Sequence, residues 1–118
     1  MQRKAQEEWR EMHDYPGYSV SNHGNVRGKS GKILKRMYSE RGGNYPFVNL
    51  TRRSNEGNMF RKNANIHVLV AEFFIGPRPL GMVIDHLDGD RDNCYFENLE
   101  YITQLENVHR GNRHKKIK

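Results

Sequence analysis

The chain has 118 residues, which is enough for one domain or for a small domain with an appended core, since single domains commonly contain about 100 to 200 residues. Its net charge of +6 and isoelectric point near 9.6 favour a polyanionic partner, although charge alone is a weak signal. Only 35% of the residues are hydrophobic and the mean hydropathy is −0.99, so the core should be small, with DNA or a metal ion ordering part of the chain.

Several classes of protein are excluded at this level. The single cysteine, Cys94, excludes a disulfide framework within a monomer and any zinc site built from paired cysteines. No apolar run approaches the roughly 18 residues that a membrane span requires. The charged start of the chain lacks the apolar core of a signal peptide. We therefore expect an intracellular, cytoplasmic protein without a membrane partner.

The first half of the chain has the pattern of short strands. Residues 1–14 are expected to form a short polar helix or a loose arm, with Trp9 as a packing anchor. Turn signals around Pro16 and across 22–25 flank short β-prone pieces. Residues 33–38 and 45–51 predict further strands, and together these pieces predict a small twisted antiparallel sheet.

Cations are concentrated in this predicted sheet. They are Arg27, Lys29, Lys32, Lys35 and Arg36, followed around the next hairpin by Arg52, Arg53, Arg61 and Lys62. One interpretation is a solvated face whose charges confer solubility. The other is a phosphate-contacting surface interleaved with aromatic side chains, since strands and hairpin loops can enter a DNA groove. These residues alone favour the two interpretations equally.

From residue 65 the hydrophobic period becomes helical. One apolar stripe runs along the predicted helix and ends at Gly76 and Pro77; it consists of Ile66, Leu69, Val70, Phe73 and Phe74. We expect this helix to form the core between the sheet and the C-terminal unit. His67 lies beside the stripe, where a packed or hydrogen-bonded structural histidine is favoured over a catalytic one.

The last third of the chain predicts strand, loop, strand and helix. Residues 82–86 form the first strand, 87–97 a polar loop, 99–102 the returning strand, and 103–106 a capping box that begins a helix. This order lets Asp85, at the end of the first strand, approach Asn107 in the first turns of the helix. Within 23 positions the chain has four residues able to position, deprotonate and coordinate water: Asp85, His86, Asn98 and Asn107. We interpret them as a single-metal phosphodiesterase site.

The same residues carry a family resemblance. The run Asp-His-Leu-Asp-Gly-Asp at 85–90, with Asn93, 97–99 and 106–107, resembles the HNH endonucleases, in particular the phage and intron-encoded type with Asn at the third motif position. Residues 9–10 and 17–27 also resemble a modular DNA-binding motif often joined to such nucleases. The two likenesses cover most of the chain, and with them DNA contact by the cations is favoured.

The resemblance implies a role for each residue of the site. His86 is the general base, since imidazole accepts a proton near neutral pH. Asn98 orients His86 through its side-chain carbonyl, or holds the loop by hydrogen bonds, and both can be true at once. Asp85 and Asn107 supply hard oxygen ligands to one Mg²⁺ or Mn²⁺, with phosphate and water completing six-fold coordination.

Nearby residues offer alternatives. His109 can replace Asn107 as a ligand or contact phosphate, but two residues along a helix turn it about 200° away, so Asn107 is favoured. A turn role is favoured over a calcium loop for Asp88 and Asp90. Arg91 fits a phosphate contact and a solvated loop position equally well.

The end of the chain is basic. Residues 109–118 contain five Lys or Arg and no acid. A frayed solubilising tail and a phosphate clamp are both open, and the adjacent phosphodiesterase helix makes the clamp at least as plausible; its cations would be Arg110, Arg113, Lys115 and Lys116.

We therefore predict an α+β protein with a small N-terminal antiparallel sheet and a helix, followed by a ββα-metal (His-Me finger) nuclease unit. Residues 1–64 form the β-rich DNA-binding region, and 65–118 hold the helix, the HNH core and the basic tail. As the resemblance implies, the expected reaction is metal-dependent hydrolysis of double-stranded DNA to 5′-phosphate and 3′-hydroxyl ends. With one site, a monomer would nick one strand, and a dimer or a second binding event would be needed for a double-strand break. The rivals are a non-catalytic DNA-binding protein that keeps the fold and an RNA-directed nuclease.

Overall fold

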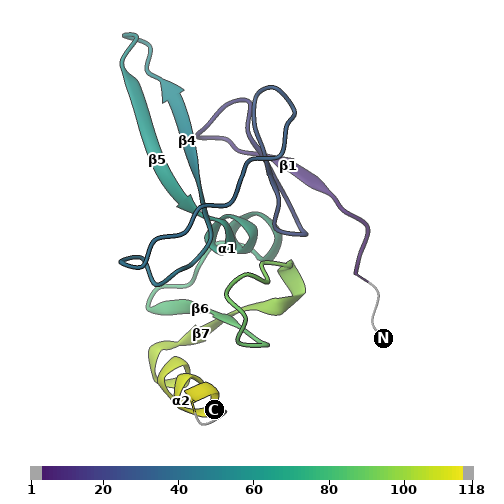
Figure 1. The fold of residues 1–118 in the computed structure, drawn as a ribbon, viewed down its shortest axis with the longest axis vertical. Helices are drawn as coiled ribbons and strands as arrows, with labels where there is room; N and C mark the ends of the chain where they lie inside the picture. The colour runs from purple at the N-terminus through teal and green to yellow at the C-terminus, as the bar shows by residue number, and fades with distance from the viewer. Residues whose placement is uncertain (1–3, 116–118) are drawn as a thin grey trace.

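The structure is a computed structural model that describes residues 4–115, with the backbone alone described for 110–115. Three small antiparallel sheets surround a short central helix (Figure 1), so the mixed α/β class is confirmed. The elements are β1 (Trp9–Glu11), β2 (Ser19–Ser21), β3 (Val26–Arg27), β4 (Phe47–Arg53), β5 (Met59–Asn65), α1 (Ile66–Val70), η1 (Ala71–Ile75), β6 (Met82–His86), η2 (Phe96–Asn98), β7 (Leu99–Thr103) and α2 (Gln104–Lys115).

The N-terminal strands form two sheets where the sequence predicted one. Within the described part of 1–14, Trp9–Glu11 is a strand, β1, that pairs with β2, so the expectation of a helix or loose arm was wrong there. Residues 33–38 make only two isolated bridges, Arg27↔Ile33 and Met37↔Phe47. The reason is that this segment crosses from the first sheet to the second and makes one bridge with each, so no continuous ladder forms.

The hairpin of β4 and β5 is the longest paired element. Its register runs from Phe47↔Asn65 to Arg53↔Met59. Val48 and Leu50 are buried on one face, as the predicted alternation requires, while the distal half of the hairpin is exposed. The hairpin projects away from the rest of the molecule (Figure 1).

The predicted helix is confirmed in two parts. α1 continues directly into the π-helical turn η1, which ends at Gly76. Gly76 has φ 133°, a conformation that favours glycine, and its amide donates to the carbonyl of Ala71 at 2.9 Å. The apolar stripe faces inward, with Ile66, Leu69 and Val70 buried.

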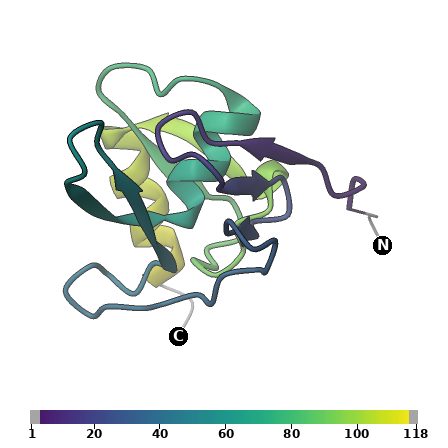
Figure 2. The same ribbon diagram turned by 90° about the horizontal axis from the view of Figure 1, so that it is seen from above.

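The ββα unit closely follows its prediction. β6 and β7 pair from Met82↔Thr103 to His86↔Leu99, and α2 begins at Gln104. Thr103 and Glu106 form the predicted capping box: the Glu106 amide donates to Thr103 Oγ1 at 3.2 Å, and the Thr103 amide donates to Glu106 Oε1 at 3.3 Å. Seen from above, α2 lies beneath the β6–β7 pair on the far side from β1–β3 (Figure 2).

One core joins the two halves of the chain. Val20, Val26, Val48 and Leu50 from the N-terminal sheets belong to the same buried cluster as residues of α1 and of the C-terminal unit, including Leu69, Val70, Cys94 and Leu99. Apolar burial therefore couples the predicted DNA-binding region to the predicted nuclease unit. Within residues 4–115, no helix has the length and apolar character needed to cross a bilayer.

Candidate active site

Strand β6 places Asp85 and His86 side by side on opposite faces. Successive side chains of a strand alternate, so His86 shares a face with Ile84, which packs against the core. Its cross-strand partner Leu99 is also in the core. His86 is 5% exposed and Asp85 is 7% exposed, so both reactive groups are largely withdrawn from bulk water.

Asp85 faces the side of the β6–β7 pair that α2 covers. Val83 shares this face and pairs with Ile102, which is 2% exposed yet lies outside the main core cluster. Because α2 packs against both strands, it is the element that buries Ile102. Asn107 is half-buried in α2, the helix that packs against both strands.

The donor set on this side fits a hard divalent cation. Asp85 offers a carboxylate and Asn107 an amide oxygen, the ligand types that Mg²⁺ and Mn²⁺ prefer. Among residues 4–109, whose side chains the structure describes, no three His, Cys, Asp or Glu side chains converge as a metal cluster. An ion held here would thus take most of its ligands from water and substrate phosphate, as is usual for Mg²⁺.

Asn98 organises the loop that follows His86, residues 87–98. Its Nδ2 donates to Asp88 Oδ1 at 3.0 Å and to the Asn93 carbonyl at 2.9 Å, while its Oδ1 accepts from the Asp88 amide at 3.1 Å. The Leu87 amide donates to the Asn98 carbonyl at 2.8 Å, which extends the β6–β7 ladder past His86. The loop-holding role of Asn98 is therefore present, and its orientation of the imidazole stays a prediction.

The acidic residues of the loop serve as turn residues. Asp88 Oδ1 accepts from the Asp90 amide at 2.8 Å, and Asp90 Oδ1 accepts from the Asp92 amide at 3.0 Å. Burial alone would raise the pKa of Asp88, but hydrogen bonds from Asn93, the Asp90 amide and Asn98 lower it below its usual value. These carboxylates are used to hold the loop, in line with the turn role expected from the sequence.

Several side chains surround the His86 ring on its own face of β6, which is opposite to the face that carries Asp85. We call Tyr45, His67, His86 and Arg91 the imidazole cluster. The ring of Tyr45 lies 4.7 Å from that of His67 and 5.8 Å from that of His86, and the two histidine rings are 5.1 Å apart, between centroids. The Arg91 guanidinium lies 4.7 Å from the Tyr45 centroid and donates to the Gly43 carbonyl. Arg91 is thus held against the N-terminal half of the chain.

Burial keeps both histidines neutral. Burial, with a smaller contribution from repulsion by the protonated form of His86, lowers the pKa of His67 to about 4. Burial also lowers the pKa of His86, against the opposing effect of Asp85 and Asp88. A neutral imidazole has one free lone pair, which is the form in which a histidine accepts a proton. His86 is therefore in the state that a general base requires.

The predicted DNA-contacting cations have different surroundings. Arg27 stacks over Trp9 at 4.1 Å and Arg52 over Phe60 at 4.9 Å, while Lys32 and Lys35 are exposed. Arg36 is bound within the protein, to the carbonyls of Asp92 and Gly24. The others are exposed: Lys29 lies near Tyr18, and Arg53 donates to the Gly57 carbonyl.

The predicted cations of the tail are described only in part. Arg110, Arg113 and Lys115 belong to α2, where only the backbone is described, and Lys116 lies outside the described residues.

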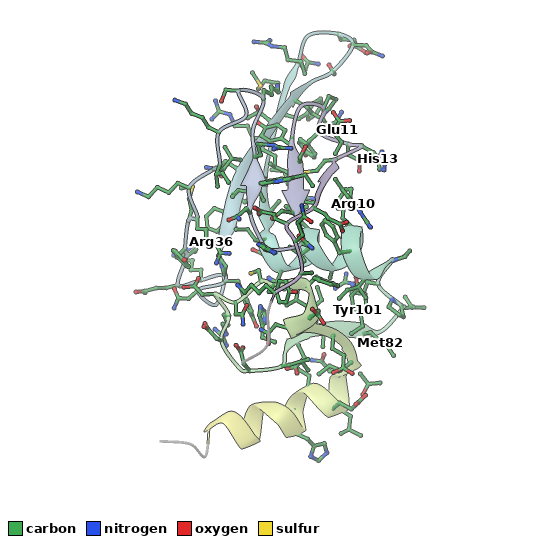
Figure 3. The ribbon with its side chains drawn as sticks, turned by 90° about the vertical axis from the view of Figure 1, so that its right-hand side faces the viewer. Arg10, Glu11, His13, Arg36, Met82 and Tyr101 are labelled. Atoms are coloured by element: carbon green, nitrogen blue, oxygen red, sulfur yellow. The ribbon has the colours of Figure 1, made fainter. Side chains whose placement is uncertain are left out.

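A cavity of about 910 Å³ lies away from this chemistry. Its lining includes Arg10, His13 and Phe73 and none of the residues from β6 to α2. Arg10 and His13 lie on the opposite side of the molecule from Arg36, which is joined to loop 87–98 (Figure 3). The predicted catalytic residues are therefore separate from this cavity and lie next to loop 87–98.

Sequence reasoning missed the imidazole cluster. His67 was interpreted as structural and Tyr45 as part of a basic sheet surface, because neither residue is near His86 in the chain. The available signal was the position of His67 in the predicted helix, between Ile66 and Leu69, which both belong to the apolar stripe. A buried ionisable side chain is a recognised indicator of a functional site.

Known proteins share both halves of this architecture. Residues 64–109 match the family described as HNH endonuclease, and residues 7–51 match the NUMOD4 motif. The chain is 39% identical over 103 residues to DNA endonuclease I-HmuI of Bacillus phage SP01, covering 86% of this chain and 55% of that protein. It is 44% identical over 47 residues to a putative HNH homing endonuclease, YosQ, of a Bacillus subtilis prophage, covering 40% of this chain and 27% of that protein.

A solved structure agrees with the sequence relatives. The structure titled "DNA binding and cleavage by the HNH homing endonuclease I-HmuI" superposes with a TM-score of 0.70 at 31% identity, over 94% of this chain and 61% of that one. The chain thus spans 55% of the length of the I-HmuI protein and 27% of the length of YosQ. The chain therefore carries a NUMOD4 motif at residues 7–51 ahead of an HNH endonuclease domain at residues 64–109, and it is homologous to I-HmuI.

Proposed function

We propose that this chain is a metal-dependent DNA endonuclease that hydrolyses one strand per binding event. The observation that carries the proposal is the placement of Asp85 and His86 on opposite faces of β6, one toward α2 and the other toward the imidazole cluster. This arrangement separates the metal-binding group from the base while keeping the two adjacent. The relative whose title names DNA binding and cleavage supports DNA as the substrate.

Each residue has a distinct task in the proposed reaction. His86 accepts the proton of the attacking water, and a positioned base of this kind accelerates hydrolysis by roughly 100- to 10,000-fold. Asp85 and Asn107 hold the Mg²⁺ or Mn²⁺ ion. When bound, that ion would stabilise the charge on the scissile phosphate and on the leaving 3′ oxygen. Attack by water breaks the bond between phosphorus and the 3′ oxygen, and the leaving oxygen takes a proton from solvent, which gives a 5′-phosphate and a 3′-hydroxyl. Asn98 keeps His86 at the end of β6 by holding loop 87–98.

The exposed cations of the N-terminal half support the DNA proposal. Lys29, Lys32 and Lys35 are exposed, as are Arg52 and Arg53 near the end of β4 in the projecting hairpin. Each contact between such a side chain and a phosphate releases counterions, which makes binding depend on salt. We propose that these residues, with the basic end of α2, hold the duplex against the nuclease unit.

A chain with one active site is expected to cut one DNA strand in each binding event. The HNH motif occurs once in the sequence, at 85–107, so a monomer has one general base and one proposed metal site. A double-strand break then requires two chains or two binding events. We propose the monomer as the active form and the nick as its product.

The proposal is tested by cleavage of supercoiled plasmid with Mg²⁺ or Mn²⁺. We expect the wild-type chain to produce open circles and His86→Ala to lose about 100-fold or more of that rate. His109→Ala, on the exposed side of α2, is the matched histidine control and should cleave normally. Equal cleavage by His86→Ala and wild type would contradict the role of His86 as the general base.

Other outcomes would favour the rival functions. Binding of DNA without cleavage by either chain would favour a non-catalytic DNA-binding protein, and stronger competition by RNA than by DNA would favour an RNA-directed nuclease.

A further inference from the structure

Arg91 is an exposed cation of loop 87–98 that the fold holds in one place. From the sequence, a phosphate contact and a solvated loop position fit Arg91 equally well. In the structure its guanidinium carbon lies 4.7 Å from the centre of the Tyr45 ring, and its Nη1 donates a hydrogen bond to the Gly43 carbonyl. Because fixing a long exposed side chain costs conformational entropy, this restraint by two partners indicates a defined role for Arg91.

The turn at residues 39–44 is shaped to hold Arg91 against Tyr45. Backbone hydrogen bonds close this turn, and two successive residues in it, Gly43 and Asn44, have φ 78° and 60°. A Cβ on Gly43 would lie 3.2 Å from the Tyr45 ring and 3.5 Å from Nη1 of Arg91. Glycine at this position therefore permits both the backbone conformation and the close approach of the two side chains.

The positive charge of Arg91 is available to a ligand. Among the residues whose side chains the structure describes, Arg91 forms no ion pair. The carboxylates next to it in sequence have other partners: Asp90 accepts from the amide of Asp92 at 3.0 Å, and Asp92 accepts from the hydroxyl of Tyr38 at 2.7 Å. A guanidinium has five N–H donors, and the Gly43 carbonyl accepts from one of them. The remaining donors can bind an anion.

Tyr45 places this guanidinium close to the general base. The centre of its ring is 5.8 Å from that of His86, so the separation between the Arg91 guanidinium and the imidazole is at most the sum of this distance and 4.7 Å. A phosphate that accepts hydrogen bonds of about 2.8 Å from the guanidinium is then within reach of a water molecule that the imidazole contacts at a similar distance. The planar fork of an arginine also matches the oxygens of a phosphate.

We propose that Arg91 binds the scissile phosphate, the one attacked by the water that His86 deprotonates. The proposal rests on the proposed function, in which His86 is the general base. Arg91 takes part in no bond change; it stabilises the negative charge on the phosphate oxygens as water adds, and it is held in place before DNA binds. Gly43 and Tyr45, which hold it, lie within residues 7–51, so the NUMOD4 motif contributes to the nuclease site.

The first test is binding of a short DNA duplex without metal, measured by fluorescence anisotropy at several salt concentrations. Arg91→Gln should reduce the slope of log K against log salt by about one. Arg78→Gln removes the same charge from an exposed arginine that lines the separate cavity, and it should leave the slope unchanged. A wild-type slope for Arg91→Gln would overturn the proposal. This readout needs no cleavage, so a reduced slope in a chain that never cleaves DNA would contradict the proposed function and leave the phosphate contact standing.

The second test is the rate of plasmid nicking at saturating DNA. Arg91→Gln should lower this rate by about 100-fold or more, because the lost interaction is strongest in the transition state. Arg91→Lys keeps the charge but not the planar fork, so it should keep the wild-type salt slope and still be slower by about tenfold or more. Because Arg91 is exposed, we expect both variants to fold, which circular dichroism checks. A wild-type nicking rate for Arg91→Gln would overturn the proposal.

The third test identifies the phosphate that Arg91 contacts. An uncharged methylphosphonate replaces the phosphate at the linkage that the wild-type chain nicks, and binding is measured without metal. This change should weaken binding by the wild-type chain by about tenfold and binding by Arg91→Gln by much less, since the variant has already lost the contact. Equal weakening of both would assign Arg91 to a different phosphate and overturn the proposal.

Discussion

Arg36 binds the backbone of Asp92 and joins the N-terminal half of the chain to loop 87–98. Its Nη1 donates to the Asp92 carbonyl at 2.6 Å and lies 3.5 Å from the Asp92 carboxylate, while Nη2 donates to the Gly24 carbonyl at 3.1 Å. Tyr38 adds a bond to the same carboxylate at 2.7 Å. Arg36 was predicted from the sequence as a DNA contact, and the structure gives it a bond network inside the protein.

Replacing Arg36 by Gln should therefore destabilise the fold. The loss of its two carbonyl contacts should lower the free energy of unfolding by about 1 to 2 kcal/mol, since the partly exposed ion pair itself adds little. Lys35→Gln, at the adjacent exposed position, should change stability by less than about 0.5 kcal/mol. Urea unfolding monitored by Trp9 fluorescence measures both. Equal stability of the two variants would show that the Arg36 network contributes nothing.

Lys35 should instead affect DNA binding. A lysine that contacts phosphate contributes affinity through counterion release, so Lys35→Gln should weaken binding to all sequences alike and reduce the slope of log K against log salt by about one. Fluorescence anisotropy with a short duplex at several salt concentrations gives this slope. A slope equal to that of the wild-type chain would place Lys35 away from the DNA.

Gly24 should tolerate alanine far less well than Gly31. Both have positive φ, 90° and 86°, so both alanines carry a similar backbone strain. A Cβ at Gly24 would lie 2.9 Å from the Cβ of Cys94, whereas one at Gly31 would meet nothing within 4 Å. We expect Gly31→Ala to cost about 1 kcal/mol and Gly24→Ala clearly more, measured as urea midpoints. Equal midpoints would mean that the contact between Gly24 and Cys94 can relax freely.

The stability of the chain should fall as the pH is lowered from 7 to 4. His67 has an ordinary pKa of 6.5, which burial lowers to about 4 in the folded chain, so the unfolded chain binds more protons between these values. Full protonation of the unfolded form corresponds to about 3 kcal/mol of lost stability. The lowered pKa of His86 acts in the same direction. Urea unfolding across this range should show a smaller pH dependence for His67→Phe, and an unchanged dependence would contradict the buried neutral state of His67.

Asn107 and His109 should differ in their effect on metal use. Asn107 is half-buried in α2, whereas His109 is exposed. Asn107→Ala should lower the apparent affinity for Mg²⁺ in plasmid cleavage by on the order of tenfold or more, while His109→Ala should leave it near wild type. Titration of the cleavage rate with Mg²⁺ makes the comparison. The reverse order would assign the ligand position to His109.

Local pattern was sufficient for the ββα unit. Alternation and turn residues placed β6 and β7, and the spacing of Thr103 and Glu106 placed the start of α2, because each of these signals acts between residues close in sequence. The same logic was wrong for residues 33–38. Their β-prone composition was real, but the segment passes between two sheets and makes one bridge with each. Strand pairing depends on which neighbour is within reach, and composition does not contain that information.

By itself, the sequence determined the order of the elements, the apolar stripe of α1 and the adjacency of Asp85 and His86 on one strand. Only the tertiary structure decided that Arg36 would be held by loop 87–98 and that His67 would lie against His86. The physical reason is that strand and helix periods are properties of neighbouring residues, whereas the packing of α1 against β6 and the loops follows from closing one apolar core over both halves of the chain. His67 and His86 are 19 positions apart, and that shared core is what brings their rings together.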